Sequence, residues 1–280
     1  MVYLYLFVDM TMLSGSRINA AMTDENLAEI WNVNSIGMNF ALTILLGYII
    51  ANYYKNKYYW IIWTVISVAM IIAIMLTGSR KAILILIIPF VVFSLYDYKK
   101  HFFKAIILLA IAGAIVWMAL EIPFFYDIIG KRLEDMINVL SGNETGREDN
   151  SRKELVELGL GWFKERPFLG YGMNCFRALS NNVPRFAGLN FYAHNNYVEI
   201  LVGGGIVGFM VYYSYVILIL KRLKHRKSLF AKYAAVILSI VLIMDFAQVS
   251  YYDVIMQMLI VFAFILLRFK GQKKILNIRK

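Results

Sequence analysis

Seven long apolar segments, separated by clusters of Lys and Arg, constrain this chain more than any other feature of its sequence. A helix needs about 20 mostly apolar residues to cross the hydrocarbon of a bilayer. The segments cover residues 36–54, 58–77, 82–98, 105–120, 197–220, 233–249 and 251–267. Each is expected to be helical, because lipid offers no hydrogen-bond partner to an open backbone. The predicted fold is therefore all-α, a polytopic transmembrane helical bundle.

The composition agrees with a membrane protein and argues against a nucleic-acid-binding one. Apolar residues make up 60% of the chain and charged residues 17%, against about 45–50% and about 25% in soluble domains. The net charge of +11 is concentrated in the short connections between apolar segments, which is how membrane topology is encoded. We therefore expect membrane lipid, and no nucleic acid, among its partners.

The basic residues in the short connections predict the orientation. Seventeen lie on one side: Lys55, Lys57, Lys99, Lys100, Lys104, Lys221, Arg222, Lys224, Arg226, Lys227, Lys232, Arg268, Lys270, Lys273, Lys274, Arg279 and Lys280. Three lie on the other: Arg17, Arg80 and Lys81. Because the basic side is cytoplasmic, the chain divides into an extracytoplasmic segment (1–35), four transmembrane helices (36–120), a large extracytoplasmic loop (121–196), three transmembrane helices (197–267) and a basic cytoplasmic tail (268–280).

The large loop is predicted to contain a short amphipathic helix. Ser151 and Glu154 have the spacing of a capping box, which marks a helix start. Four apolar residues then share one face: Leu155, Leu158, Trp162 and Phe163. Pro167 is expected to end the helix, with a turn at Gly170 and Gly172. We expect this helix to lie along the membrane surface with its apolar stripe inward.

Two arginines on the extracytoplasmic side are candidate anion ligands. Arg80 lies at the outer end of the second segment, where a cation opposes the topological bias. It either extends to lipid headgroups or binds a phosphate. Arg152 falls in the first turn of the expected loop helix, where the helix dipole disfavours a cation. It either shares a bound anion with free backbone N–H groups or pairs with Glu148 or Asp149.

His194 is a candidate general base at the outer membrane surface, just ahead of the fifth segment. A neutral imidazole there can accept a proton from a hydroxyl, although a histidine in this position also serves as a hydrogen-bonding anchor. Asn195 is expected to contact the substrate. Glu199, one turn into the fifth segment, is expected to contact the substrate or to orient the imidazole.

Other residues suggest structural roles or remain open. Gly203–Gly205 and Gly208 lie within the fifth segment and predict close helix packing. Pro89 predicts a kink in the third segment. Asp245, near the end of the sixth segment, is a functional candidate as an intramembrane carboxylate. Cys175 is the sole cysteine, which excludes an intrachain disulfide or a thiolate cluster.

The order of these motifs resembles the O-antigen ligase and polymerase family. The motifs are Thr77-Gly78-Ser79-Arg80, then Ser151-Arg152, then Pro167-Phe168-Leu169-Gly170-Tyr171-Gly172, then His194-Asn195-Asn196-Tyr197, and last Gly205-Ile206-Val207-Gly208. The resemblance implies a GT-C-like, inverting glycosyltransferase that needs neither metal nor other cofactor. Its donor would be a glycan on undecaprenyl pyrophosphate. Arg80 and Arg152 would bind the pyrophosphate, and His194 would deprotonate the acceptor hydroxyl.

The expected activity is polymerisation of an O-antigen or capsule type of surface polysaccharide in the bacterial cytoplasmic membrane. One alternative is a ligase that transfers the glycan to a lipid A core or a protein. A second is a membrane transporter or flippase component without covalent chemistry. Expected partners are the lipid-linked donor and a glycan acceptor, with a chain-length regulator and a flippase as further candidates. Family members usually carry more spans ahead of this region, so we expect the chain to lack the family's N-terminal transmembrane segments.

Overall fold

The computed structural model describes residues 33–77, 79–96, 121, 126, 147–224 and 228–268, and all extended secondary structure in these ranges is helical. The helices are α3 (Val33–Tyr54), α4 (Lys57–Thr77), α5 (Arg80–Tyr96), α9 (Arg147–Glu165), α10 (Phe176–Asn181), the 3-10 helix η3 (Pro184–Phe186), α11 (Asn196–Lys224), α12 (Leu229–Met244) and α13 (Val254–Leu266). They divide between two compact units, of which the second runs from Glu144 to Lys280.

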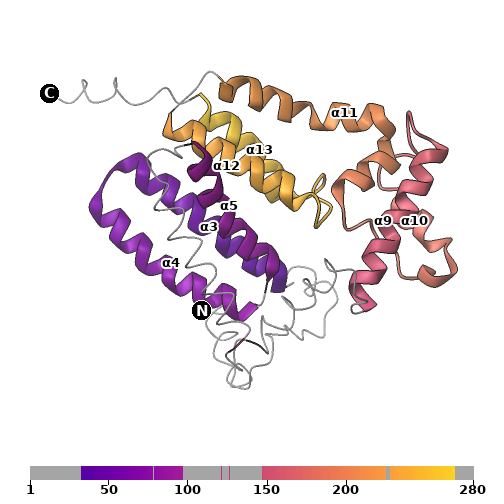
Figure 1. Ribbon diagram of the computed structural model, residues 1–280, viewed down its shortest axis with the longest axis horizontal. Helices are drawn as coiled ribbons and strands as arrows, with labels where there is room; N and C mark the ends of the chain where they lie inside the picture. Colours follow the sequence, from indigo (N-terminus) through magenta and orange to yellow (C-terminus); the bar gives the residue numbers. More distant parts are fainter. Residues whose placement is uncertain are drawn as a thin grey trace. The chain divides into compact units, whose positions relative to one another are not determined.

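Helix α3 is the centre of the first unit and packs against both α4 and α5 (Figure 1). At Gly47 of α3, an added Cβ would lie 1.6 Å from the indole ring of Trp63 on α4. The glycine therefore admits the ring, whose N–H donates to the carbonyl of Ile44 at 3.1 Å. Large apolar side chains such as Ile61 and Val65 cover the outer face of α4, as expected of a helix that faces lipid.

A buried turn places Arg80 at the start of α5. Thr77 and Ser79 are both buried, and the Ser79 hydroxyl accepts a hydrogen bond from the Ala82 N–H at 3.4 Å. At Gly37 of α3, an added Cβ would come within 2.8 Å of both Thr77 and Ser79 side chains. The turn is thus held closely against α3, and it fixes the position at which Arg80 begins the helix.

The second unit contains a core built by the loop ahead of α11. This core comprises Leu155, Phe176, Phe186, Ala193, Val198 and Val202, with Leu158 and Trp162 packed against it. It joins α9 to α10, η3 and the first turns of α11 (Figure 1). The apolar stripe predicted on α9 exists, but its expected contact with the membrane is wrong for Leu155, Leu158 and Trp162. Their side chains pack on protein because α10 and α11 cover that face.

Helix α11 is broken at Gly205, which has φ 60° and ψ −164°. Residues 167–172 fill the break with four backbone hydrogen bonds: Tyr171 N to Val202 O, Gly172 N to Gly203 O, Ile206 N to Pro167 O and Val207 N to Phe168 O, at 2.8–3.2 Å. A Cβ on Gly205 would lie 2.3 Å from the Phe168 carbonyl. The predicted packing of these glycines against another helix is wrong: Gly203 and Gly205 approach the backbone of residues 168–173, and an added Cβ on Gly208 would meet nothing within 4 Å.

Helices α12 and α13 pack against each other and against α11. Ser228 caps α12, since its hydroxyl accepts from the Ala231 N–H. Asp253 caps α13 in the same way, through two backbone N–H groups. The sixth predicted segment was expected to run to Val249, but α12 ends at Met244. Asp245 therefore lies in a connection between the two helices and not inside a helix.

The described helices support the prediction of an all-α membrane protein. Three of them are long and apolar enough to cross a bilayer: 35–54, 57–74 and 196–224. The apolar helices α12 and α13 are shorter. The predicted segment 105–120 lies outside the described residues, as do nearly all of 1–35 and the tail after Arg268. The kink expected at Pro89 stays a prediction, although Pro89 does lie inside α5.

Candidate functional site

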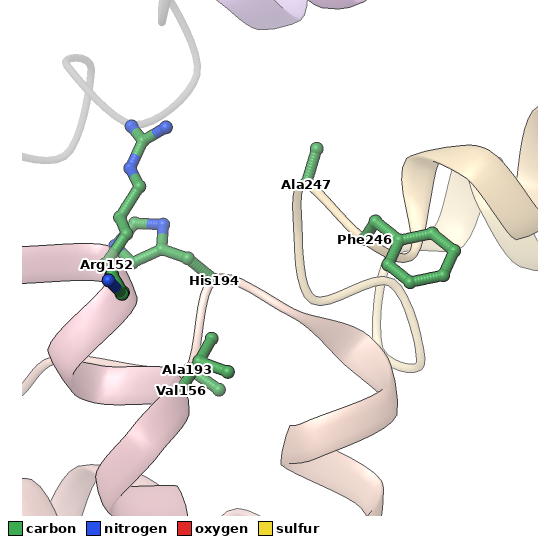
Figure 2. A pocket seen from close by; sticks show the side chains of 7 residues that line it. Arg152, Val156, Ala193, His194, Phe246 and Ala247 are labelled. Atoms are coloured by element: carbon green, nitrogen blue, oxygen red, sulfur yellow. The ribbon is translucent and has the colours of Figure 1, made fainter. Parts of the chain in front are cut away.

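One pocket in the second unit brings two of the candidate residues together. It has a volume of about 330 Å³ and is lined by Arg152, Lys153, Val156, Ala193, His194, Phe246 and Ala247. Figure 2 shows Arg152 and His194 on one side of it, and Phe246 and Ala247 on the other. Two lining side chains are cationic and, among the described residues that line it, none is acidic. The pocket therefore suits a negatively charged group beside an imidazole.

His194 lies in a strained turn between the loop core and α11. Its φ is 53°, a left-handed value that residues with a side chain adopt uncommonly and that often marks functional sites. Its ring lies against that of Tyr192, with the ring centroids 4.0 Å apart. The next residue, Asn195, caps α11, because its side-chain oxygen accepts a hydrogen bond from the Val198 N–H at 3.2 Å. This turn places His194 in the lining of the pocket, with its ring toward Arg152 (Figure 2).

Glu199 stabilises this turn through a hydrogen bond to its backbone. Its carboxylate is buried, with 4% of the residue exposed, and accepts a hydrogen bond from the Ala193 N–H at 2.9 Å. This side-chain oxygen satisfies a buried backbone N–H that would be costly to leave unpaired. Glu199 does not line the pocket, and its hydrogen bond holds the backbone next to His194. The predicted contacts of Asn195 and Glu199 with substrate stay predictions.

A network of buried polar groups joins the start of α11 to the connection between α12 and α13. The Asn196 side chain accepts from the N–H groups of Ser250 and Tyr251, both at 3.0 Å, and donates to the Tyr213 hydroxyl. Tyr213 in turn donates to the Asp245 carboxylate at 2.8 Å, which also accepts from the Ser250 hydroxyl. Because buried polar groups are costly to leave unpaired, the network fixes residues 246–247 opposite His194.

Arg152 reaches the pocket from a different helical position than the sequence predicts. Helix α9 begins at Arg147, so the capping box expected at Ser151 and Glu154 is wrong, and Arg152 lies in the second turn. Glu154 forms an ion pair with Arg185 instead. The expectation that Arg152 shares an anion with free N–H groups of the first turn therefore loses its basis. The side chain itself, next to Lys153, still faces the pocket.

Arg80 belongs to the first unit, and the structure describes its backbone but not its side chain. It is the first residue of α5, and the helix dipole favours an anion at such a position. The part of the chain that the structure describes holds no group of three or more His, Cys, Asp or Glu side chains able to hold a metal ion. The expected metal-independent chemistry remains a prediction.

A family model described as O-antigen ligase matches residues 65–213, which is more than half of the chain. The chain belongs to the O-antigen ligase family. Membership supports a membrane-embedded, glycosyltransferase-like enzyme of the ligase or polymerase type. A search of curated proteins finds no match.

The O-antigen ligase match includes Arg80, Arg152 and His194, and the pocket joins the last two. Sequence analysis missed the opposite wall, which is formed by Phe246 and Ala247. Asn196 belongs to one of the sequence motifs, but its role in the buried network was not predicted. Asp245 was noticed as a carboxylate in an apolar region, and that signal leads to the buried network. Nothing in the pattern of α11 distinguishes Tyr213 from the other tyrosines of the same helix.

Proposed function

We propose that this O-antigen ligase family member polymerises a surface polysaccharide at the outer face of the bacterial cytoplasmic membrane. The donor is a glycan on undecaprenyl pyrophosphate, and the acceptor is a sugar hydroxyl of a second chain. The observation that carries the proposal is that Arg152, Lys153 and His194 line one pocket. Cations that suit a phosphate and a base that suits a hydroxyl are the two requirements of this transfer.

The proposed step forms one bond and breaks another at the anomeric carbon. His194 accepts the proton of the acceptor hydroxyl as its oxygen attacks that carbon. The bond between the carbon and the pyrophosphate oxygen breaks, and undecaprenyl pyrophosphate leaves. Arg152 stabilises the negative charge that develops on the leaving group, with Lys153 as a second cation. Attack from the side opposite the leaving group inverts the anomeric centre, and no metal takes part.

Arg80 is proposed to bind the donor pyrophosphate as well, on the strength of its place in the family pattern and at a helix start. The exposed ring of Phe246 is proposed to pack against a sugar, since the C–H face of a pyranose is apolar and an aromatic side chain offers a flat apolar surface. A ligase would use the same donor chemistry with a different acceptor. The pattern of glycans on a gel distinguishes a polymerase from a ligase.

The test is complementation in a cell that lacks its own surface-glycan polymerase and makes the matching lipid-linked donor. The unmutated chain should restore a ladder of glycans on a gel, with one step per repeat. Arg152→Ala and His194→Ala should each lose the ladder. A single shifted band of uniform length, instead of a ladder, would identify a ligase.

The matched control is Lys164→Ala, which removes a cation from the other end of α9, outside the pocket lining. It should leave the ladder intact, and equal amounts of each variant in the membrane should be confirmed by immunoblot. A ladder from Arg152→Ala and His194→Ala equal to that of the unmutated chain would contradict the proposal.

A further inference from the structure

The break in α11 lies at a depth where a membrane offers no hydrogen bonds. Residues 206–220 are fifteen residues without a charged side chain, followed by Lys221, Arg222 and Lys224. At about 1.5 Å per residue they cover about 22 Å, which is less than the roughly 30 Å thickness of the hydrocarbon. With the basic end of the helix at one interface, the opposite boundary lies beyond Gly205. Any tilt of the helix increases the shortfall.

Irregular backbone at that depth is tolerated only where protein satisfies it. Here residues 167–172 supply the partners: two of their N–H groups donate to the carbonyls of Val202 and Gly203, and two of their carbonyls accept from Ile206 and Val207. The contact is also sterically close. At Gly170, with φ 66°, a Cβ would lie 2.5 Å from the Val202 carbonyl oxygen. The loop must therefore sit at the depth of the break.

Three large apolar side chains in or next to this loop are exposed. Phe168 is 72% exposed, Leu169 73% and Met173 54%, which is unusual for large apolar groups so close together. They continue a surface that already faces lipid, because Val207 and Met210 beside them on α11 are exposed too. The apolar stripe of α9, in contrast, is covered by protein.

The residues beside this apolar patch are of the kind found at membrane interfaces. The Arg166 guanidinium lies over the Tyr171 ring, 4.5 Å from its centroid, and the Tyr171 hydroxyl donates to Glu165. Tyrosine is enriched at the level of the lipid headgroups, and a long arginine side chain extends to that level from a position near it. The polar groups of Glu165, Arg166 and Tyr171 thus suit the headgroup layer of a bilayer. The apolar side chains of Phe168, Leu169 and Met173 suit the acyl-chain layer.

We propose that residues 167–173 form a re-entrant loop that inserts Phe168, Leu169 and Met173 among the acyl chains of the bilayer. The loop pairs the backbone groups that the break in α11 leaves without helical partners, and it sets the depth of the pocket relative to the membrane. This inference rests on membrane insertion alone and stands whether or not the protein transfers glycans.

The test uses the full chain in nanodiscs of phosphatidylglycerol and phosphatidylethanolamine, with Cys175→Ser removing the sole native thiol. An environment-sensitive fluorophore is attached at Phe168→Cys or Leu169→Cys in separate proteins. Glu157→Cys on α9 and Ala187→Cys after η3, both at exposed positions, are the matched controls. All four positions are exposed in the structure, so labelling leaves the core unchanged.

Probes at 168 and 169 should emit at shorter wavelength than the controls, lose quenching by iodide and gain quenching by lipids with a nitroxide on the acyl chain. Probes at 157 and 187 should respond to iodide. Iodide quenching at 168 and 169 equal to that at the controls, without quenching by the labelled lipids, would overturn the proposal. Unfolding is excluded if the unlabelled cysteine variants keep the thermal midpoint of the Cys175→Ser protein.

Discussion

Adding one methyl group at Gly205 tests the break in α11 directly. The glycine has φ 60° and ψ −164°, and a Cβ there would lie 2.3 Å from the carbonyl carbon and oxygen of Phe168 and 2.6 Å from the N of Leu169. These are backbone atoms, so they cannot rotate away as a flexible side chain would. In Gly205→Ala, either α11 or the loop must shift.

The expected loss has two parts. Holding a residue other than glycine in this region of φ and ψ costs about 1–3 kcal/mol. Displacing the loop weakens its hydrogen bonds to Ile206 and Val207, at roughly 0.5–1.5 kcal/mol each. We therefore expect Gly205→Ala to lower the free energy of unfolding by about 2–6 kcal/mol. At about 2–4 °C per kcal/mol for a large chain, the midpoint of thermal unfolding should fall by roughly 4–24 °C.

Gly208 is the matched control, because it lies three residues further along α11 and an added Cβ would meet nothing within 4 Å. Gly208→Ala should leave the midpoint unchanged or raise it, since alanine favours a helix interior by about 0.5–1 kcal/mol. Unfolding can be followed with a fluorogenic maleimide that reports exposure of Cys175, which lies in the same unit. Equal midpoints for Gly205→Ala and the unmutated chain would refute the reasoning. Equal losses in both variants would instead favour helix packing at both glycines.

Three other predictions concern the second unit. Asn196→Ala should lower the free energy of unfolding by about 2–3 kcal/mol, because it leaves buried donors and acceptors unpaired. Asn195→Ala should lower it by about 1 kcal/mol, because it removes a helix cap. The thermal assay compares the two variants, and an equal loss of stability would contradict the role of the buried network. Glu199→Gln should keep near-normal stability and glycan transfer, since an amide oxygen can still accept from the Ala193 N–H. Glu199→Leu should lose both, and full activity of this variant in the complementation assay would disprove the positioning role of Glu199. Burial raises the pKa of the Cys175 thiol, so less thiolate is present near neutral pH. Alkylation of the folded protein should therefore be slow near neutral pH and should accelerate as the pH rises past the ordinary pKa range of a thiol. Rapid alkylation at neutral pH, measured by mass spectrometry, would contradict this prediction.

Most of the helical architecture follows from hydropathy, because long apolar segments in a membrane have no alternative to helix. Six of the seven predicted segments coincide with described helices, with ends that differ by a few residues. The sixth ends early, at Met244, where the carbonyl of Asp245 accepts from the Asn196 N–H at 2.7 Å in place of a helical N–H. Hydropathy could not predict this, since residues 246–249 are mostly apolar.

The break in α11 was not predicted, and its cause lies outside local sequence. A glycine cluster in an apolar helix is commonly a packing site, and the sequence placed its expected kink at Pro89. The partner of the cluster is the segment 167–172, more than thirty residues earlier in the chain. The motifs 167–172 and 205–208 of the family resemblance therefore contact each other, which their spacing alone does not reveal.

Two residues of the candidate site were predictable from the sequence, but its geometry and its opposite wall were not. Arg152 and His194 were chosen for their unusual places in the charge pattern, and both line the pocket. The reason given for Arg152 was wrong, because α9 begins one turn earlier than its capping signal indicates. Phe246 carries no sequence signal, since an aromatic residue at the end of an apolar segment is ordinary.

We propose that Arg152 binds the anionic donor while His194 removes the acceptor proton. The most direct measurement compares binding with transfer for the purified chain in nanodiscs. Binding is titrated with farnesyl pyrophosphate, a short probe of the donor's pyrophosphate, and transfer is followed with lipid-linked glycan from the complemented cells. We expect His194→Ala to bind the probe as the unmutated chain does and to transfer nothing, whereas Arg152→Ala should lose both. Undiminished transfer by His194→Ala, or undiminished binding by Arg152→Ala, would contradict the assignment.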